Sequence, residues 1–370
     1  MDKPVISPYR RVITALRGGH AGKIPFTVYD IMIPRCTEER QLRNRGMCLV
    51  KLMTSYKIHY PDVEIKSIQY TGEDGQNLIR TMYTTPRGDL STLSRVSGFV
   101  NDWRLEHMFK TPDDYKALLF LMRNAVVVPD YAAAARTVEE SGEDYIVRDQ
   151  IGLLGLEPLQ TLISSIIMSP QDFCIEWMEN RDELLKLYDA IAEVNRKIYK
   201  VVADGPLEIA NYGGNVIPQI IGADTFRKYY LQHYNEAAEI LHGKGKLIGC
   251  HFDADNTTIM DDIGKTDLDY IEAYDPGISP PVGEARKKWP DKVLWINWPS
   301  SWHLEPPDVV RAKTIELIED AGAEDGFIIG ITEDVPRERM LQNYCAIMDG
   351  IEASSSSNCV WEQERGRPSL

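Results

Sequence analysis

A histidine and several carboxylates lie at the ends of four apolar segments. These segments, each predicted to be a strand, are 247–253 (LIGCHFD), 270–275 (YIEAYD), 293–298 (VLWINW) and 327–333 (FIIGITE). Side chains of a strand alternate between two faces, so parity along each segment separates an outer, helix-facing set from an inner set. The residues predicted to share the inner face are His251, Asp253, Glu272, Tyr274, Trp295, Asn297 and Glu333.

This inner set has the composition of a divalent-metal site. One imidazole with two or three carboxylates suits zinc, which in catalytic sites takes three protein ligands and leaves one position open. A histidine hydrogen-bonded to a carboxylate without any metal would give the same pattern, so both interpretations stand at this point. Asp30 is a further candidate, as a substrate hydrogen-bonding group or a helix cap, and Trp295 is a candidate wall of an aromatic pocket or a packing residue.

The elements that must position these residues follow a βα pattern. From residue 205 onward, short apolar runs alternate with longer amphipathic stretches, which is typical of a parallel sheet covered by helices. The remaining predicted strands are 24–31, 126–130, 145–150 and 207–212. About eight βα units predict an α/β fold, a closed (β/α)8 TIM barrel, with its reacting groups at the carboxyl ends of the strands.

Residues 63–105, between the first two predicted barrel strands, have a different sequence pattern. Three alternating segments separated by turn residues are typical of an antiparallel meander. We therefore expect one barrel domain over 1–370 with an N-terminal antiparallel β-meander insertion. The segment 354–370 has too little apolar content to pack, and we expect it to be a mobile tail.

Composition narrows the classes of partner and compartment. The net charge of −15 and pI of about 5.0 argue against nucleic-acid binding, because nucleic-acid binders usually carry a basic stripe. No apolar run approaches the length of a signal peptide or membrane span, so we expect a cytoplasmic protein without a membrane partner. The six cysteines form no CxxC pair, which favours free thiols. A homo-oligomer is compatible with the sequence.

Several segments resemble the uroporphyrinogen decarboxylase superfamily. They are RRVITALRGGHAGKIPFTVYD, TTPRGDL, GADTFRKYYLQHYNEAAEILHGKGKLIGCHFDADN and TDLDYIEAYDP. The resemblance spans nearly the whole chain and implies a (β/α)8 barrel. It also implies one of two activities, because the superfamily divides into decarboxylases of the porphyrin pathway and corrinoid-dependent methyltransferases.

Departures from two family motifs favour the methyltransferase branch. The decarboxylases carry Arg-Gln-Ala-Gly-Arg-Tyr after the first strand, whereas this sequence has VYDIMIPRCTEER, which lacks that motif and has Arg35 as the arginine nearest the strand. Thiol-acting methyltransferases of the superfamily bind zinc through His-x-Cys and a later Cys. Here Asp253 and Glu333 stand near those two thiolate positions, and an oxygen-rich set leaves zinc a stronger Lewis acid, suited to an ether or alcohol oxygen.

The spacing of Glu236, His251 and Glu272, with fourteen and twenty residues between them, resembles the methyltransferase component of aryl methyl ether O-demethylases. The resemblance implies zinc on His251 and Glu272, which are also the predicted catalytic residues. The third ligand is Glu236 or Glu333. Glu236 lies so far along its predicted helix that it would stand ~20 Å from the barrel mouth, which favours Glu333.

The resulting hypothesis is methyl transfer from a methoxylated small molecule, expected to be aromatic, to Co(I) of a corrinoid. The corrinoid is expected on a separate protein that docks at the barrel mouth, and zinc is expected to activate the ether oxygen. Substrate-positioning roles are assigned to Asp30, Tyr212, Asp253, Trp295 and Asn297. The alternatives are a methylamine, methanol or methyl-sulfur donor, a uroporphyrinogen decarboxylase, or a catalytically silent barrel that binds a small molecule or partner.

Overall fold

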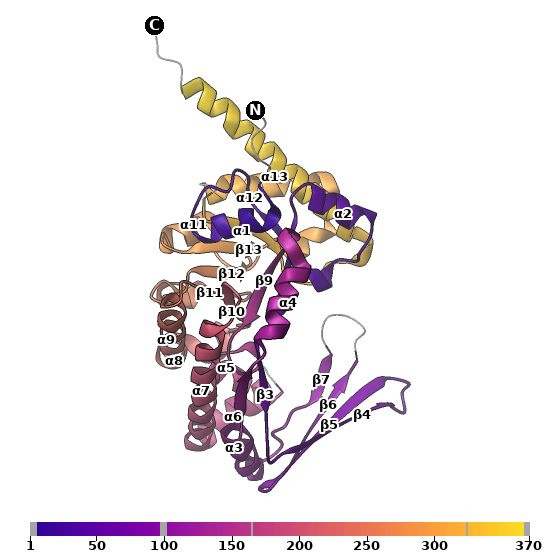
Figure 1. Ribbon diagram of the computed structural model, residues 1–370, viewed down its shortest axis with the longest axis vertical. Coiled ribbons are helices and arrows are strands. Elements are labelled where there is room, and N and C mark those ends of the chain that lie inside the picture. Colours follow the sequence, from indigo (N-terminus) through magenta and orange to yellow (C-terminus); the bar gives the residue numbers. More distant parts are fainter. Residues whose placement is uncertain (1–5, 97–101, 164–165, 323–324, 366–370) are drawn as a thin grey trace. The chain divides into compact units, whose positions relative to one another are not determined.

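Eight parallel strands form a closed barrel in the order β1-β14-β13-β12-β11-β10-β9-β2. The computed structural model describes residues 6–96, 102–163, 166–322 and 325–365, with side chains described as far as residue 355. The barrel strands are β1 (Phe26–Tyr29), β2 (Cys48–Met53), β9 (Tyr145–Gln150), β10 (Ile209–Tyr212), β11 (Leu247–His251), β12 (Tyr270–Tyr274), β13 (Val293–Asn297) and β14 (Phe327–Ile331). Figure 1 labels five of them, β9 to β13. This topology confirms the predicted (β/α)8 barrel.

The chain divides into two compact units, and the first contains the candidate site. It comprises residues 1–52, 137–148 and 247–370. Strands β11 to β14 are short buried runs, as expected for parallel strands covered on both faces. Besides the strands, its main helices are α1 (Pro8–Leu16), α2 (Thr37–Asn44), α10 (Met260–Ile263), α11 (Val282–Lys288), α12 (Pro307–Ala321) and α13 (Arg337–Arg365).

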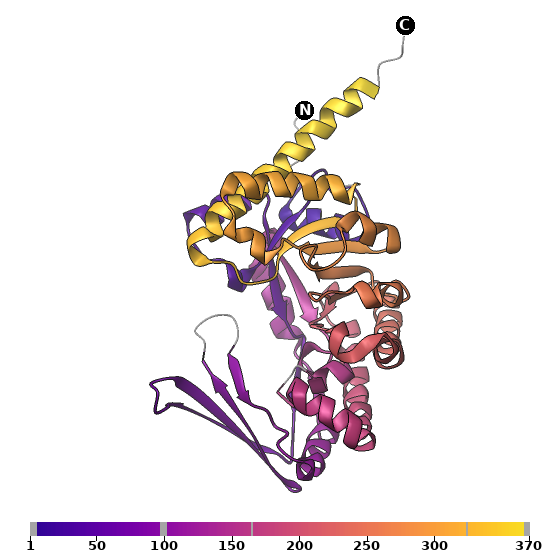
Figure 2. The same cartoon turned by 180° about the vertical axis from the view of Figure 1, so that it is seen from behind.

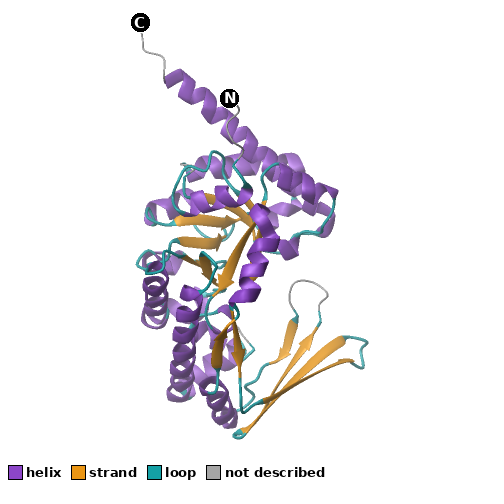
Figure 3. Ribbon diagram, in the orientation of Figure 1, coloured by secondary structure: helices purple, strands orange, loops and turns teal. Residues whose placement is uncertain are grey.

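The second unit, residues 53–136 and 149–246, combines helices with two antiparallel sheets. Its helices, purple in Figure 3, are α3 (Tyr115–Arg123), most of α4 (Tyr131–Ser141), α5 (Pro158–Ile163), α6 (Pro170–Glu179), α7 (Arg181–Asp204), α8 (Pro218–Tyr229) and α9 (Leu231–His242). The 24-residue helix α7 buries an apolar stripe at helical spacing, including Leu184, Leu187, Ile191, Val194 and Ile198.

A four-stranded antiparallel sheet confirms the predicted meander. Its strands β4 (Glu64–Thr71), β5 (Asn77–Thr85), β6 (Gly88–Arg95) and β7 (Trp103–Glu106) pair in chain order. They lie side by side in the view of Figure 2 as well as in Figure 1. The turn of β4 into β5 contains Gly75 at φ +74°, a conformation that glycine adopts without steric cost.

One predicted barrel strand is wrong. The segment 126–130 forms β8 (Val126–Pro129), which pairs antiparallel with β3 (Tyr56–His59) outside the barrel. Its residues are exposed or half-buried, whereas barrel strands are buried on both faces. The barrel instead includes β2, which sequence reasoning missed because Lys51 interrupts its apolar run. The meander therefore follows the second barrel strand.

The C-terminal segment 354–370 is described in part. The backbone of 354–365 is helical as part of α13, residues 366–370 lie outside the described residues, and the mobile tail stays a prediction. The single-domain assignment also stays a prediction.

The five described cysteines are free thiols, and Cys359 lies beyond the described side chains. Within the described ranges, every helix is too short or too polar to cross a membrane.

Candidate functional site

His251 and Glu272 meet on neighbouring barrel strands. His251 is the last residue of β11 and stands directly beside Glu272 of β12 in the parallel register. The Asp269 side chain fixes this register by accepting a hydrogen bond from the Ile248 backbone N–H at 2.7 Å. His251 Nδ1 then lies 2.8 Å from Glu272 Oε2, so Nδ1 carries a proton and donates a hydrogen bond to the carboxylate.

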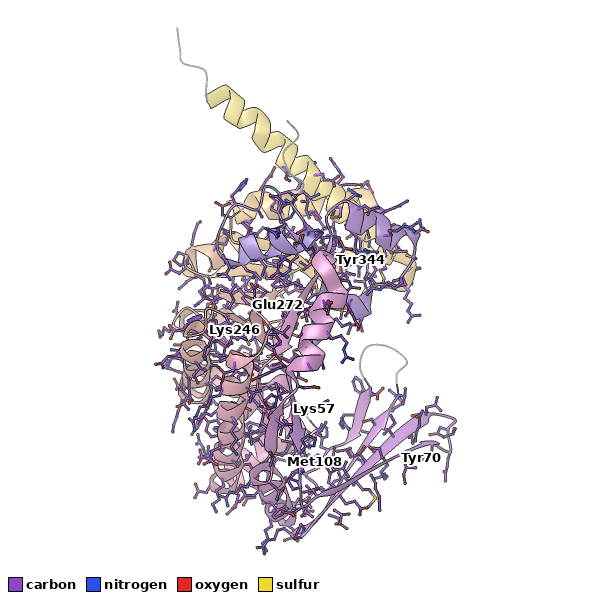
Figure 4. The ribbon with its side chains drawn as sticks, viewed as in Figure 1. Lys57, Tyr70, Met108, Lys246, Glu272 and Tyr344 are labelled. Carbon is purple, nitrogen blue, oxygen red and sulfur yellow. The ribbon has the colours of Figure 1, made fainter. Side chains whose placement is uncertain are left out.

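A tyrosine and an arginine complete the buried side of this pair. Arg148 of β9 forms an ion pair with Glu272, with 2.8 Å between Nη1 and Oε1, and its Nη2 donates to the Tyr29 hydroxyl at 2.6 Å. Tyr29 of β1 donates in turn to Glu272 Oε1 at 2.5 Å. The side chains of Arg148 and Glu272 are 2 % and 0 % exposed. Figure 4 labels Glu272 in the barrel.

This network determines the charges of its members. Burial would raise the pKa of Glu272, but the charges of Arg148 and His251 overcome burial and lower it to about 2. Burial would lower the pKa of His251, but Glu272 and Tyr29 hold it well above its usual value. Burial raises the pKa of Tyr29 well above its usual value. Glu272 is therefore an anion and Tyr29 a neutral donor at neutral pH.

The other nitrogen of His251 faces carboxylates nearer the surface. Its Nε2 lies 3.6 Å from Asp253 Oδ2 and 3.4 Å from Glu333 Oε1, and these two side chains are 30 % and 41 % exposed. One donor atom from each of the three residues falls within 4.8 Å of the others. A nitrogen and two carboxylate oxygens in this arrangement could hold one metal ion.

A third acid adds to the negative charge here. Burial raises the pKa of Asp275, just beyond β12, and the negative charges of Glu333 and Asp253 raise it further. Arg148 is already matched to Glu272 on the opposite side of the histidine, so it does not neutralise these three acids. The donor set and the local excess of negative charge therefore fit a divalent cation.

A β-bulge next to Glu272 shapes this part of the site. The pairing of β12 with β13 shifts register between Glu272 and Tyr274, and Ala273 between them has φ +58°, which is rare for a residue other than glycine. Tyr274 was predicted to face inward, but its ring packs on Trp289 at the end of α11 and its hydroxyl donates to the Pro280 carbonyl. The bulge ends the alternation on which that prediction depended.

Two other predicted residues of the first unit have structural partners near the site. Trp295 is fully buried, donates from Nε1 to the Thr27 hydroxyl at 2.9 Å and stacks its ring against the Arg148 guanidinium. Asn297 accepts a hydrogen bond from the Thr332 backbone N–H at 3.1 Å, which helps to position the segment carrying Glu333. Substrate contact by either residue stays a prediction.

The remaining predicted residues are Asp30, Tyr212 and Glu236. Among the described contacts, no hydrogen bond or ion pair links Asp30, at the start of the 3₁₀ turn Asp30–Met32, to His251 or its partners. In the second unit, Tyr212 is buried and donates to the Tyr199 hydroxyl at 2.5 Å, while Glu236 accepts from Arg196 Nε at 2.7 Å. Roles for these three residues remain predictions.

Sequence reasoning missed Arg148, Tyr29 and Asp275. A signal for Arg148 was present, since an arginine inside the strand YIVRDQ needs a buried counter-ion. Tyr29 lies at the end of β1, where a tyrosine is as common in packing as in a polar network. Asp275 was part of a predicted strand end but was assigned no role.

Comparison with solved structures identifies the barrel architecture in other proteins. A methyltransferase from Methanosarcina mazei superposes with a TM-score of 0.56 at 11 % sequence identity, covering 94 % of this chain and 99 % of that one. A B12-independent methionine synthase from a Shewanella species, in complex with selenomethionine, gives a TM-score of 0.45 at 9 % identity, covering 87 % of each chain. At such identities only the first likeness carries an argument, and that argument concerns the fold.

No family model matches the sequence. No curated protein matches it either. The chemistry must therefore be argued from the residues of the site.

Proposed function

We propose that the chain is a methyltransferase that moves a methyl group from a methoxylated aromatic molecule to Co(I) of a corrinoid carried by a partner protein. The observation that carries the proposal is the two-sided environment of His251, with its Nδ1 held by Glu272 and its Nε2 facing Asp253 and Glu333. The barrel likeness to the Methanosarcina methyltransferase supports the proposal at the level of the scaffold.

The residues proposed to hold zinc are His251 through Nε2, Asp253 and Glu333. Their donor atoms are close enough to share one ion, and the carboxylates supply the charge that a divalent cation requires. Bound there, zinc would act as a Lewis acid toward an ether oxygen, because three protein ligands leave a position open. Glu272, predicted as a ligand, acts in this proposal through the histidine, since its oxygens already contact Arg148, Tyr29 and His251.

The buried network has a definite task in this reaction. Glu272 accepts a hydrogen bond from Nδ1–H and so fixes the tautomer of His251 that leaves Nε2 available for a metal. Arg148 and Tyr29 hold Glu272 in place, and the Trp295 ring supports Arg148 from one face. These residues keep the imidazole oriented through the reaction cycle and exclude water from its inner side.

The reaction itself is a displacement at the methyl carbon. The bond between oxygen and methyl breaks with its electron pair left on the oxygen, and Co(I) supplies the pair for the new bond. An aryl ether is a poor electrophile because phenolate leaves reluctantly. Stabilising the developing negative charge on oxygen is therefore the main requirement placed on the site.

The proposal is tested by metal analysis and activity on the same preparations. Wild type is expected to hold about one zinc ion per chain and to transfer methyl from a methoxyarene to reduced corrinoid protein. His251→Ala, and the paired Asp253→Asn with Glu333→Gln, should lose both metal and activity. Glu236→Gln, which removes the carboxylate paired with Arg196, is the matched control and should keep both.

Two outcomes would overturn parts of this proposal. Zinc that persists in His251→Ala would contradict the ligand set. A protein that binds zinc but methylates corrinoid only from methanol, a methylamine or a methylated sulfur compound would keep the site and replace the substrate class.

A further inference from the structure

A cavity in the second unit is independent of the metal candidate. It has a volume of about 180 Å³ and lies between the antiparallel sheet, helix α3 and two loops. Its walls include Ile65 of β4, Tyr83 of β5, Leu121 and Met122 of α3, and Met108. All its lining residues belong to the second unit, whereas the His251 cluster belongs to the first.

The walls of the cavity are held by regular structure. Ile65 and Tyr83 are directly opposite each other in the antiparallel pair of β4 and β5, so both side chains project from the same face of the sheet. Across from them, the Met108 backbone N–H donates to the Ile166 carbonyl at 2.9 Å, which joins the two loops that close the cavity. The lining residues on both walls are thus fixed by backbone hydrogen bonds.

Two tyrosines are the residues with polar side-chain atoms in an otherwise apolar lining. Tyr60 and Tyr83 both line the cavity, and the hydroxyl of neither is hydrogen-bonded to any residue that the structure describes. Burial raises the pKa of Tyr60 to about 12, so its hydroxyl stays a proton donor at neutral pH. A bound molecule with an oxygen acceptor would take the place of solvent as the partner of these donors.

The rim of the cavity contains strained backbone. Leu154 has φ +57° and ψ +20°, although it is neither glycine nor asparagine, and its side chain is half exposed where it borders the cavity. Non-glycine residues in this conformation are strained and concentrate at functional sites. Strain at a half-exposed leucine is consistent with a rim shaped for an occupant.

We propose that this cavity binds a monocyclic aromatic molecule that carries a hydroxyl or methoxy group. A dry apolar cavity of about 150 Å³ is large enough to bind benzene, so about 180 Å³ accommodates a ring with one small substituent. The apolar walls and the two methionines contact the ring, since thioethers pack well against aromatic edges. Tyr60 and Tyr83 donate to the oxygen. The inference does not rest on the proposed methyl transfer.

Calorimetric titration of the full chain with phenol, methoxybenzene and toluene tests the proposal. We expect saturable binding of all three at one site, with phenol and methoxybenzene about fivefold tighter than toluene, the gain of one net hydrogen bond. Absence of saturable binding for all three would overturn the proposal. Equal affinity for phenol and toluene would overturn the role of the hydroxyls.

Variants assign the binding to this cavity. Leu121→Phe fills its interior and Ile65→Trp fills its half-exposed rim, and each should weaken binding at least tenfold. Ile65 tolerates a large side chain better because it is partly exposed, which covers the case in which Leu121→Phe fails to fold. Binding that survives in folded Ile65→Trp would place the ligand elsewhere.

Three further variants separate this site from the rest of the chain. Tyr83→Phe should remove most of the preference for phenol over toluene, whereas Tyr70→Phe, on β4 but not lining the cavity, should leave it unchanged; Met108 of the cavity and Tyr70 are both labelled in Figure 4. His251→Ala should leave all three affinities unchanged even where zinc or methyl transfer is lost. Affinities that fall with His251→Ala would assign the ligand to the His251 cluster and overturn the proposal.

Discussion

The two sides of the His251 ring differ in how their charges are balanced. On the inner side, Arg148, Tyr29 and Glu272 satisfy one another, and the carboxylate is fully buried and matched by a guanidinium. On the outer side, Asp253, Glu333 and Asp275 gather three acids that Arg148 does not neutralise. The inner side is balanced in charge, and the outer side carries an excess of negative charge.

Removal of the buried cation on the inner side should cause the largest loss of stability. Arg148→Met leaves the Glu272 carboxylate buried without its counter-ion, so we expect a loss of about 3–5 kcal/mol in the free energy of unfolding. Chemical denaturation measures it. Arg45→Met is the control, because Arg45 pairs with Asp349 and Glu352 at the surface and should cost no more than ~1 kcal/mol. Equal losses in the two variants would contradict a buried charge pair.

A second buried histidine has no carboxylate partner among the described contacts, and its response to pH can be compared with that of the His251 network. His303 is buried beside Trp298 and Asn343, and burial lowers its pKa to about 4 from the usual 6.5. The unfolded chain binds this proton more readily, so stability is present above pH 6.5 and is lost as pH falls toward 4, by about 3 kcal/mol.

Denaturation curves between pH 7 and pH 4 measure this effect. His303→Phe keeps a ring of similar size and removes the titrating nitrogen, so its stability should fall less across this range. His59→Gln, at an exposed position of β3, should retain the wild-type slope. An unchanged slope in His303→Phe would assign the acid lability to other groups.

Removing charge on the outer side should have a smaller effect. Asp253→Asn with Glu333→Gln relieves repulsion among the outer acids but also removes the two carboxylates that face the His251 ring, so the free energy of unfolding of the metal-free protein should change by no more than ~1 kcal/mol. Denaturation in the presence of a chelator measures this. A loss of several kcal/mol would show that these carboxylates belong to the scaffold.

A substitution at the bulge of β12 should have the smallest effect on stability. Ala273→Gly relieves a positive φ but increases the flexibility of the unfolded chain, so the free energy of unfolding should change by less than ~1 kcal/mol. Ala238→Gly in helix α9 is the control and should destabilise by ~1 kcal/mol or more. A large loss in Ala273→Gly, seen in the same denaturation assay, would mean that the methyl group itself is needed for packing.

Sequence patterns predicted this architecture more fully than the contacts within it. Parity along β11 placed His251 and Asp253 together, because the strand is regular up to His251. Parity failed at Tyr274, since a bulge leaves no signature in the residue types around Ala273. Arg148 was missed because its partner lies 124 positions away in sequence, and only the closed barrel brings β9 residues to Glu272.

The buried ion pair has a consequence for how such a barrel can diversify. Because Glu272 and Arg148 neutralise each other inside the barrel, exchanges at positions 253 and 333 leave no buried charge uncompensated. Thiols, amides or further carboxylates can therefore replace those two side chains one substitution at a time while the chain still folds. Substitutions in a protein with this interior can therefore change the side chains at the barrel mouth while the buried core stays the same.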